Sequence, residues 1–221
     1  MHEAPVFLPP GQKVGPYAIE RVLGHGANGI AYLAHDRTLD RKVVLKEHYP
    51  QGLCTRDADS HCLIPLDEDT ESLFAESVNR FIREARLIAS LEHPSIIKIH
   101  RVFSLSPTTC FYVMPLLEGG TLREVIHSGK RIPPRTLLSW LQTLVSALDC
   151  LNQHHIVHLD IKPGNILFTA RSGRFRHRFS SPSSWLSQYP GSFRVLGSGI
   201  VHGRRRTRHP GGSILPGSVL L

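Results

Sequence analysis

The segment HLDIKPGNIL, residues 158–167, places three polar side chains at a spacing that could support the transfer of a phosphoryl group. The carboxylate of Asp160 could accept a proton from a hydroxyl group. Lys162 could neutralise a transferring phosphate, and Asn165 could supply an oxygen ligand to Mg²⁺, which prefers hard oxygen donors. The same residues could equally form an ordinary polar loop after a helix, so other motifs must decide between the two interpretations.

A glycine-rich turn near the N-terminus could approach the phosphates of a nucleotide. Gly24, Gly26 and Gly29 form the pattern G-x-G-x-x-G within GHGANG, and glycine permits the close backbone approach that such a turn needs. A Rossmann-type turn requires a helix directly after the glycines. The residues that follow, IAYLAHD, read as a strand and argue against that type. A flexible hairpin turn remains the alternative.

Lys46 and Glu84 are charged residues on segments that we expect to be partly buried. Lys46 ends the β-branched run VVLK, where an unpaired charge is unfavourable. Glu84 lies three residues after Phe81 and four before Ile88, on the apolar face of a predicted helix. An ion pair between the two would satisfy both charges. Alternatively, each is a solvated charge at the edge of its element.

Hydrophobic periodicity predicts the elements that must position these residues. Runs of alternating and β-branched residues predict five strands, at residues 17–24, 30–36, 42–48, 95–105 and 110–116. Apolar residues at helical spacing predict three helices, at residues 70–91, 121–128 and 134–152. Residues 49–69 are polar and rich in turn formers, and they predict a loop. This order of strands and helices indicates an α+β domain built on an antiparallel sheet.

Five motifs follow one another in the order and at the spacing found in protein serine/threonine kinases. They are GHGANG, VVLK, Glu84 before HPSII, YVMPLLEGGTL and HLDIKPGNIL. The chain resembles that family over about residues 14–168, and LKEHYP resembles the K-E-Y-F-P run of bacterial members. The resemblance implies a protein-kinase-like fold with an antiparallel five-stranded N-lobe and one helix. It also implies four segments: an N-terminal extension at 1–13, the N-lobe at 14–117, a partial helical C-lobe at 118–170, and a tail at 171–221.

The resemblance implies an ATP site on the N-lobe. The glycine-rich turn would cover the phosphates, and Lys46 would hold the α- and β-phosphates while pairing with Glu84. Met114 would be the gatekeeper residue, and the backbone of Pro115 to Leu117 would be the hinge that binds adenine. The implied ATP-binding set comprises Leu23, Gly24, Gly26, Gly29, Ala31, Val44, Lys46, Glu84, Met114, Pro115, Leu117 and Leu167.

The same resemblance assigns the catalytic and metal-binding roles. Asp160 would be the catalytic base that receives the proton of a protein substrate's Ser or Thr hydroxyl. Lys162 would steady the γ-phosphate, and Asn165 would bind Mg²⁺. ATP and Mg²⁺ are therefore the cofactors that the resemblance implies.

The chain departs from the family pattern in three places. Leu159 stands where many kinases have the Arg of H-R-D. Ala31 and Val44 exchange the usual large and small residues around adenine, a swap that nearly conserves volume and should be tolerated. The largest departure is that no D-F-G follows NILF and no A-P-E occurs in the sequence.

The composition changes abruptly at Arg171. The net charge of +8 arises there, because residues 171–221 contain nine Arg and no acid, whereas the first 170 residues carry 17 basic against 18 acidic residues. A segment so rich in Arg, Ser, Gly and Pro predicts disorder. It could be an out-of-frame or truncated product, a genuine basic tail, or a nucleic-acid-binding arm. If the tail is genuine, the chain could be a catalytically inactive nucleotide-binding remnant. If the tail is an arm for nucleic acid, the chain would be a nucleic-acid-binding protein. This last interpretation is the weakest, because aromatic residues are not interleaved with the Arg.

Other features of the sequence concern the location of the protein in the cell and a possible metal site. The first residues lack the basic and apolar regions of a signal peptide, and no apolar run is long enough to span a bilayer. We therefore expect a cytoplasmic protein without membrane partners, whose oligomeric state stays open. Four residues in or beside the 49–69 loop are of types that bind Zn²⁺, but their spacing fits no common zinc finger: His48, Cys54, His61 and Cys62.

Overall fold

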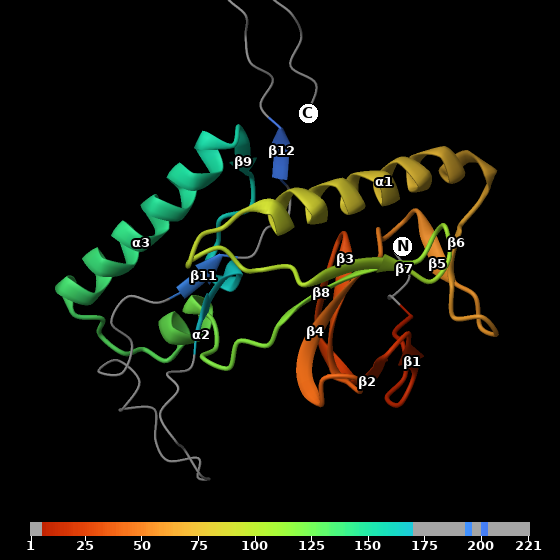
Figure 1. The fold of residues 1–221 in the computed structure, drawn as a ribbon, viewed down its shortest axis with the longest axis horizontal. Coiled ribbons are helices and arrows are strands. Elements are labelled where there is room, and N and C mark those ends of the chain that lie inside the picture. The colour runs from red at the N-terminus through yellow and green to blue at the C-terminus, as the bar shows by residue number, and fades with distance from the viewer. Residues whose placement is uncertain (1–5, 170–192, 196–199, 203–221) are drawn as a thin grey trace, which may run out of the picture.

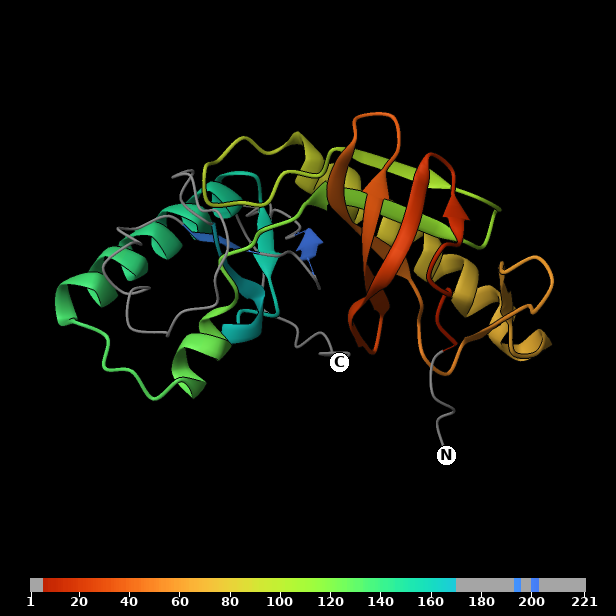
Figure 2. The same cartoon turned by 90° about the horizontal axis from the view of Figure 1, so that it is seen from below.

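The computed structural model describes residues 6–169, 193–195 and 200–202 of the chain. Figures 1 and 2 show two parts, an antiparallel sheet crossed by one long helix and a smaller helical part beside it. Strands, a helix, further strands and two helices follow one another as predicted, which confirms the α+β class. No helix within the described ranges is long and apolar enough to cross a membrane.

The sheet has six antiparallel strands in the spatial order β1-β2-β3-β4-β8-β7. Five correspond to the five predicted strands, and the sixth is a two-residue strand, β1, that pairs with the start of β2. The bounds are β1 Lys13–Val14, β2 Tyr17–Gly26, β3 Gly29–Asp36, β4 Arg41–His48, β7 Arg101–Ser104 and β8 Cys110–Pro115.

The strand predicted at residues 95–105 is shorter in the structure, because β7 begins only at Arg101. The residues before it include Ile96, Ile97 and Ile99, which are buried without joining a strand. They belong to the same apolar core as Ala147 of the second part of the molecule. A short apolar run therefore predicted burial correctly, but it could not distinguish a strand from an irregular buried segment.

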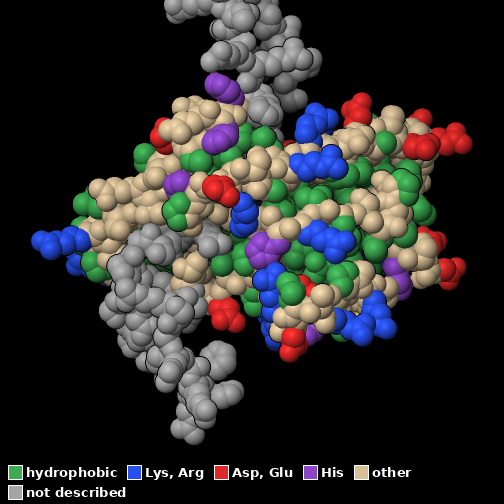
Figure 3. Space-filling view, in the orientation of Figure 1, with side chains coloured by type: hydrophobic (Ala, Val, Ile, Leu, Met, Phe, Trp, Pro, Cys, Tyr) green, Lys and Arg blue, Asp and Glu red, His purple; other side chains and the backbone are tan. Residues whose placement is uncertain are grey.

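Helix α1, Glu68–Ser90, begins with a capping box in which Asp67 accepts a hydrogen bond from the backbone N–H of Thr70. Acidic residues fill its first turn, where they interact favourably with the helix dipole. Figure 3 shows acidic side chains at the right edge of the molecule, the side on which α1 begins in Figure 1. Its buried face packs on the sheet through residues at helical spacing: Phe74, Val78, Phe81, Ala85 and Ile88.

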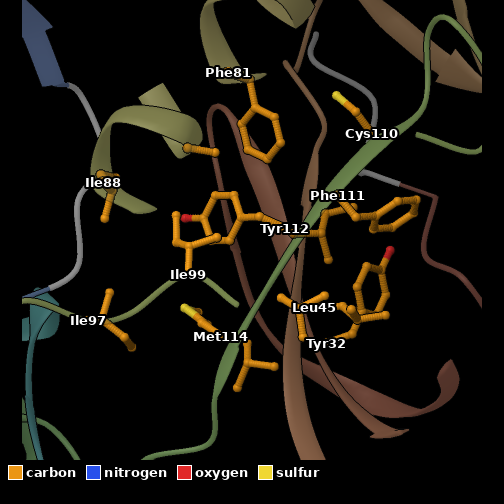
Figure 4. Packing of buried hydrophobic residues seen from close by; sticks show 14 of the residues in the cluster. Tyr32, Leu45, Phe81, Ile88, Ile97, Ile99, Cys110, Phe111, Tyr112 and Met114 are labelled. Carbon is orange, nitrogen blue, oxygen red and sulfur yellow. The ribbon is translucent and has the colours of Figure 1, made fainter. Parts of the chain in front are cut away.

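The two faces of the sheet carry different sets of side chains. Figure 4 shows Tyr112 on the side of α1, where its ring stacks on that of Phe81 with centroids 5.2 Å apart. Leu45 and Tyr32 lie on the opposite face. We call the face that α1 covers the inner face, and the face that carries Leu45 and Tyr32 the outer face. Because strand residues alternate between faces, Lys46 belongs to the inner face and Glu47 to the outer face.

Two segments cover the outer face. Residues 49–69, predicted to form a loop, contain a small hairpin made of β5, Cys54–Arg56, and β6, Leu63–Pro65. The N-terminal segment also packs here, since Leu8 is buried and its N–H donates to the Tyr32 hydroxyl at 3.3 Å. The sequence did not predict the hairpin, because its residues are rich in turn formers. It did not predict the packing of the N-terminal segment, because that segment is too short to show a periodic pattern.

The second part of the molecule contains two helices that agree with the predicted ones within two residues. Its apolar centre is formed by Trp140, Ile166 and Phe168. The elements are α2 Leu122–His127, α3 Pro134–Gln153, β9 Ile156–His158, the 3₁₀ turn η1 Pro163–Asn165 and β10 Ile166–Phe168.

Two short strands fall within the segment predicted to be disordered. β11, Phe193–Val195, pairs with β10, and β12, Ile200–His202, pairs with β9. These six residues differ from the prediction that 171–221 is disordered. The remainder of that prediction lies outside the described residues.

Candidate active site

We call residues 158–165 the polar loop. Its residues Asp160, Lys162 and Asn165 form one hydrogen-bonded cluster. Asp160 Oδ2 lies 2.8 Å from Lys162 Nζ and 2.9 Å from Asn165 Nδ2. Asn165 Nδ2 also donates to the Asp160 backbone carbonyl at 2.8 Å. Both amide hydrogens are thereby used, which directs the Oδ1 atom of Asn165 away from Asp160 as an available oxygen ligand.

Local structure holds the polar loop between two strands. β9 ends at His158, whose Nδ1 accepts a hydrogen bond from the N–H of Asp160 at 3.2 Å. η1 then turns the chain into β10, and the guanidinium of Arg123 on α2 packs against Gly164, within 3.1 Å of the point that a Cβ atom would occupy. A side chain at position 164 would therefore displace Arg123.

A close backbone contact ties the segment after the predicted hinge to β10, the strand that follows the polar loop. After Leu117 the chain reaches Gly119, whose N–H donates to the Phe168 carbonyl at 3.0 Å, while Gly120 accepts from Phe168 N–H at 2.9 Å. A Cβ on Gly119 would lie 2.4 Å from that carbonyl oxygen, so only glycine fits. Leu167, predicted to contact ATP, is thus held beside the residues that follow the hinge, and it forms an isolated β-bridge with Thr121.

The glycine-rich turn is the end of the β2–β3 hairpin. Gly24 pairs with Ala31, and Gly26 pairs with Gly29 across the turn. A Cβ on Gly29 would lie 2.5 Å from the backbone oxygen of Glu47, so this glycine permits close contact with β4. A Cβ on Gly24 or Gly26 would meet nothing within 4 Å. The hairpin therefore has space on the side where a nucleotide phosphate is expected.

The residues predicted to surround adenine share the inner face. Lys46 lies opposite Ala31, and Val44 lies opposite Met114 in the strand pairing. Val44 and Met114 are buried, while Lys46 is half-buried. Leu23, in contrast, is exposed at the hairpin. Pro115 ends β8, and among the described residues the N–H of Leu117 makes no hydrogen bond, which leaves it available as a donor.

The predicted ion pair between Lys46 and Glu84 is not formed in this structure. Within the described ranges the two charges do not approach within the 4.0 Å that defines an ion pair. Burial raises the pKa of Glu84, and the positive charges of Arg80 and Lys46 oppose that increase. Helical periodicity placed Glu84 on the correct face of α1, but it could not determine the distance between helix and strand.

A second charged cluster lies on the outer face, and the sequence analysis missed it. Arg56 of β5 donates to both carboxylate oxygens of Glu47, at 3.0 and 2.7 Å, and the Tyr32 hydroxyl donates to Glu47 Oε2 at 2.9 Å. An available signal was the acid directly after Lys46 on a buried strand. Such an acid needs a partner, and Arg56 is the first Arg or Lys after it.

The possible zinc ligands named above do not form a metal site in the structure. His48 packs on the ring of Phe81, with centroids 4.9 Å apart, and its Nε2 lies 2.8 Å from Ser77 Oγ. Cys54 is buried in β5. In the part of the chain that the structure describes, no group of three or more His, Cys, Asp and Glu side chains could hold a metal ion.

The donor set fits a nucleotide better than it fits a bound magnesium ion. Open space beside two glycines, a half-buried lysine and the available N–H of Leu117 suit phosphates and a base. For Mg²⁺, which needs about six oxygen ligands, the described residues offer the Asn165 Oδ1 atom and the carboxylate of Asp160, which is already bonded to Lys162. The metal's site is therefore incomplete within the described residues.

Comparisons with known proteins agree with this arrangement. The family model described as the protein kinase domain matches residues 17–176. The serine/threonine-protein kinase PrkC of Bacillus subtilis (strain 168) is 35% identical over 153 residues, which cover 69% of this chain and 20% of PrkC. The serine/threonine-protein kinase pkn2 of Myxococcus xanthus is 32% identical over 160 residues, which cover 72% of this chain and 17% of pkn2. The chain thus spans about a fifth of the length of these curated relatives.

A solved structure titled PpkA-294 apo form has the same fold, with a TM-score of 0.67 and 29% sequence identity. The alignment covers 74% of this chain and 58% of that chain. The matched residues of the family model include both the glycine-rich hairpin and the polar loop, and they end at residue 176, shortly after the composition changes at Arg171. Because that match covers well over half of the sequence, the chain belongs to the protein kinase family.

Proposed function

We propose that this chain binds ATP on the inner face of its sheet, and that the kinase it represents transfers the γ-phosphate of ATP to Ser or Thr hydroxyls of a protein. The observation that carries the proposal is the cluster of Asp160, Lys162 and Asn165, joined by hydrogen bonds of 2.8–2.9 Å in the order of the kinase motif. Because kinases use cytoplasmic ATP, we also propose that the domain works in the cytoplasm.

The nucleotide roles follow from where each group lies. The backbone of the glycine hairpin lies over open space and would cover the phosphates. Lys46 would bind the α- and β-phosphates, with Ala31 and Val44 beside the adenine ring. The Pro115 carbonyl and the Leu117 N–H would bind the edge of the base. Leu167 would close the site from the side of the second lobe.

The reaction would use the polar loop. Asp160 would accept the proton of the attacking hydroxyl, and Lys162 would stabilise the negative charge of the phosphoryl group during transfer. Mg²⁺, when bound, would neutralise charge on the β- and γ-phosphates, with Asn165 Oδ1 as a ligand. The ammonium of Lys162 lies 2.8 Å from Asp160 Oδ2 and has three donors, so it could bond to a phosphate oxygen while staying beside the carboxylate.

We further propose that this 221-residue chain binds ATP without transferring phosphate. No D-F-G motif follows NILF in the sequence, so the acid that holds the principal metal ion in kinases has no counterpart here. Loss of one electrostatic element of this kind typically lowers the rate by about 10²–10³-fold. The chain would then act as a nucleotide-binding remnant of a kinase.

Two measurements on the purified chain test these proposals separately. Binding of a fluorescent ATP analogue with Mg²⁺ should saturate, and it should weaken in Lys46→Met but not in Lys98→Met, an exposed lysine outside the site. Absence of saturable binding would refute the ATP site. Radiolabelled ATP should give no labelled protein with this chain or a generic basic protein. Labelling that disappears in Asp160→Ala would refute the second proposal and identify a working kinase.

A further inference from the structure

Glu47 is a fully buried acid next to the lysine of the proposed ATP site. Its side chain is 0% exposed and points to the outer face, whereas the neighbouring Lys46 belongs to the inner face. A buried carboxylate is unfavourable unless its oxygens are hydrogen bonded. The partners that surround Glu47 therefore determine where this part of β4 can lie.

Arg56 satisfies Glu47 and joins it to two other segments. The guanidinium, whose side chain is 1% exposed, donates to both Glu47 oxygens in a bidentate arrangement. Its Nε hydrogen binds the backbone carbonyl of Val6, at 2.9 Å, and a hydrogen on Nη1 binds that of His61, at 2.8 Å. Arg56 thus connects β4 to the N-terminal segment and to the β5–β6 hairpin, both of which lie on the outer face.

The same cluster reaches the strand that carries the glycine hairpin. Tyr32 of β3 donates to Glu47, and its neighbour Ala31 lies directly opposite Lys46. The backbone oxygen of Glu47 is also in contact with Gly29. Any movement of Glu47 would therefore displace both Lys46 and the base of the hairpin.

We infer that Arg56 is a positioning residue for the ATP site, which fixes Lys46 and the glycine hairpin by holding Glu47 from the opposite face of the sheet. The inference rests on the proposed ATP site. A planar guanidinium with two bonds to one carboxylate defines both distance and orientation, which an apolar contact does not. A sub-ångström placement of Lys46 matters because misplacing a group by about 1 Å can reduce its effect about 100-fold.

The first test separates positioning from general stability. Arg56→Met leaves a buried charge without its partner and should weaken binding of the fluorescent ATP analogue at least about tenfold. Ile19→Ala, a buried position at the far end of β2, should lower the melting temperature as much yet change the affinity less than about twofold. Equal loss of affinity in the two variants at equal loss of stability would overturn the inference.

A double variant tests whether a loss of affinity in Arg56→Met is caused only by unfolding of the chain. Glu47→Leu with Arg56→Met replaces the ion pair with apolar groups, a change that often restores stability. The inference predicts recovery of the melting temperature without recovery of ATP-analogue affinity. Arg56→Lys, which keeps the charge but not the bidentate geometry, should give an intermediate affinity. Full recovery of affinity in the double variant would show that Arg56 contributes stability alone.

A third measurement does not depend on ATP binding. Lysines are labelled by reductive ¹³C-methylation, and the signal of Lys46 is identified by its loss in Lys46→Arg. The Lys46 signal should shift or broaden in Arg56→Met and in the double variant, but not in Ile19→Ala. An unchanged Lys46 signal in both would refute the inference, even if the wild-type chain bound no nucleotide and the proposed function failed independently.

Discussion

Asn165 donates both hydrogens of its side-chain amide to Asp160, one to carboxylate oxygen Oδ2 and one to the backbone carbonyl. This pair sets the orientation of both residues before any ligand binds. It holds Asp160 near the end of β9, and it leaves the Asn165 carbonyl oxygen as the atom that can bind a cation. The pair therefore links the predicted base to the predicted metal ligand.

Substituting Asn165 should remove the effect of magnesium on nucleotide binding. In the wild-type chain we expect the ATP analogue to bind more tightly with Mg²⁺ than with a chelator. Asn165→Ala should weaken Mg²⁺-dependent binding by about tenfold, which corresponds to about 1.4 kcal/mol, and leave chelator-treated binding nearly unchanged. Asn152→Ala, at an exposed position near the end of α3, serves as the control. Retained magnesium dependence in Asn165→Ala would mean that Asn165 is not a ligand.

The contact between Gly119 and Phe168 makes position 119 intolerant of a side chain. Gly119→Ala would place Cβ 2.4 Å from the Phe168 carbonyl oxygen, and we expect a loss of about 1–3 kcal/mol in the free energy of unfolding. Gly26→Ala meets nothing within 4 Å and should change it by less than about 0.5 kcal/mol. Urea denaturation followed by circular dichroism compares the two. Equal stability of both variants would contradict the observed contact.

His48 should make the chain less stable in acid. Burial lowers the pKa of His48 from 6.5 to about 4 in the folded chain, and the positive charges of Arg80 and Lys46 act in the same direction. As pH falls below 6.5, the unfolded chain takes up a proton that the folded chain does not. The stabilisation is complete above 6.5 and is lost as pH falls towards 4, by about 3 kcal/mol in all.

The measurement compares unfolding at pH 7.5 and pH 4.5 for His48→Leu and for His25→Leu, an exposed control. His48→Leu should lose about 2.5 kcal/mol less than wild type between these pH values. His25→Leu should follow the wild-type dependence. If all three proteins lose the same stability, His48 does not control the acid response.

One side of α3 should promote self-association of the chain. Leu138 is 59% exposed and Val145 is 62% exposed. Both lie on the same face of α3 as Leu141, which is also exposed. Exposed apolar surface of this kind favours association. Leu138→Glu with Val145→Glu should reduce the concentration dependence of sedimentation without lowering the melting temperature. Asn79→Glu, which adds charge at an exposed position of α1, should not. Association unaffected by the double substitution would exclude this face.

Local pattern in the sequence determined the order and type of most elements and the motifs of the family. Helical spacing found α1 and its buried face, and the α3 prediction ended within one residue of the observed end. The polar loop and the glycine hairpin were identified because their residues lie close together along the chain. Such features depend on backbone geometry over a few residues, which sequence patterns record directly.

Tertiary structure alone decided which distant residues meet. The pairing of Glu47 with Arg56 rather than with a more distant base, and the separation of Lys46 from Glu84, depend on how the β5–β6 hairpin and α1 pack against opposite faces of one sheet. Periodicity assigns a side chain to a face, but not to a partner on another element. Partner choice follows from burial: a carboxylate inside the core must bind whichever donor the packed chain brings within hydrogen-bond distance.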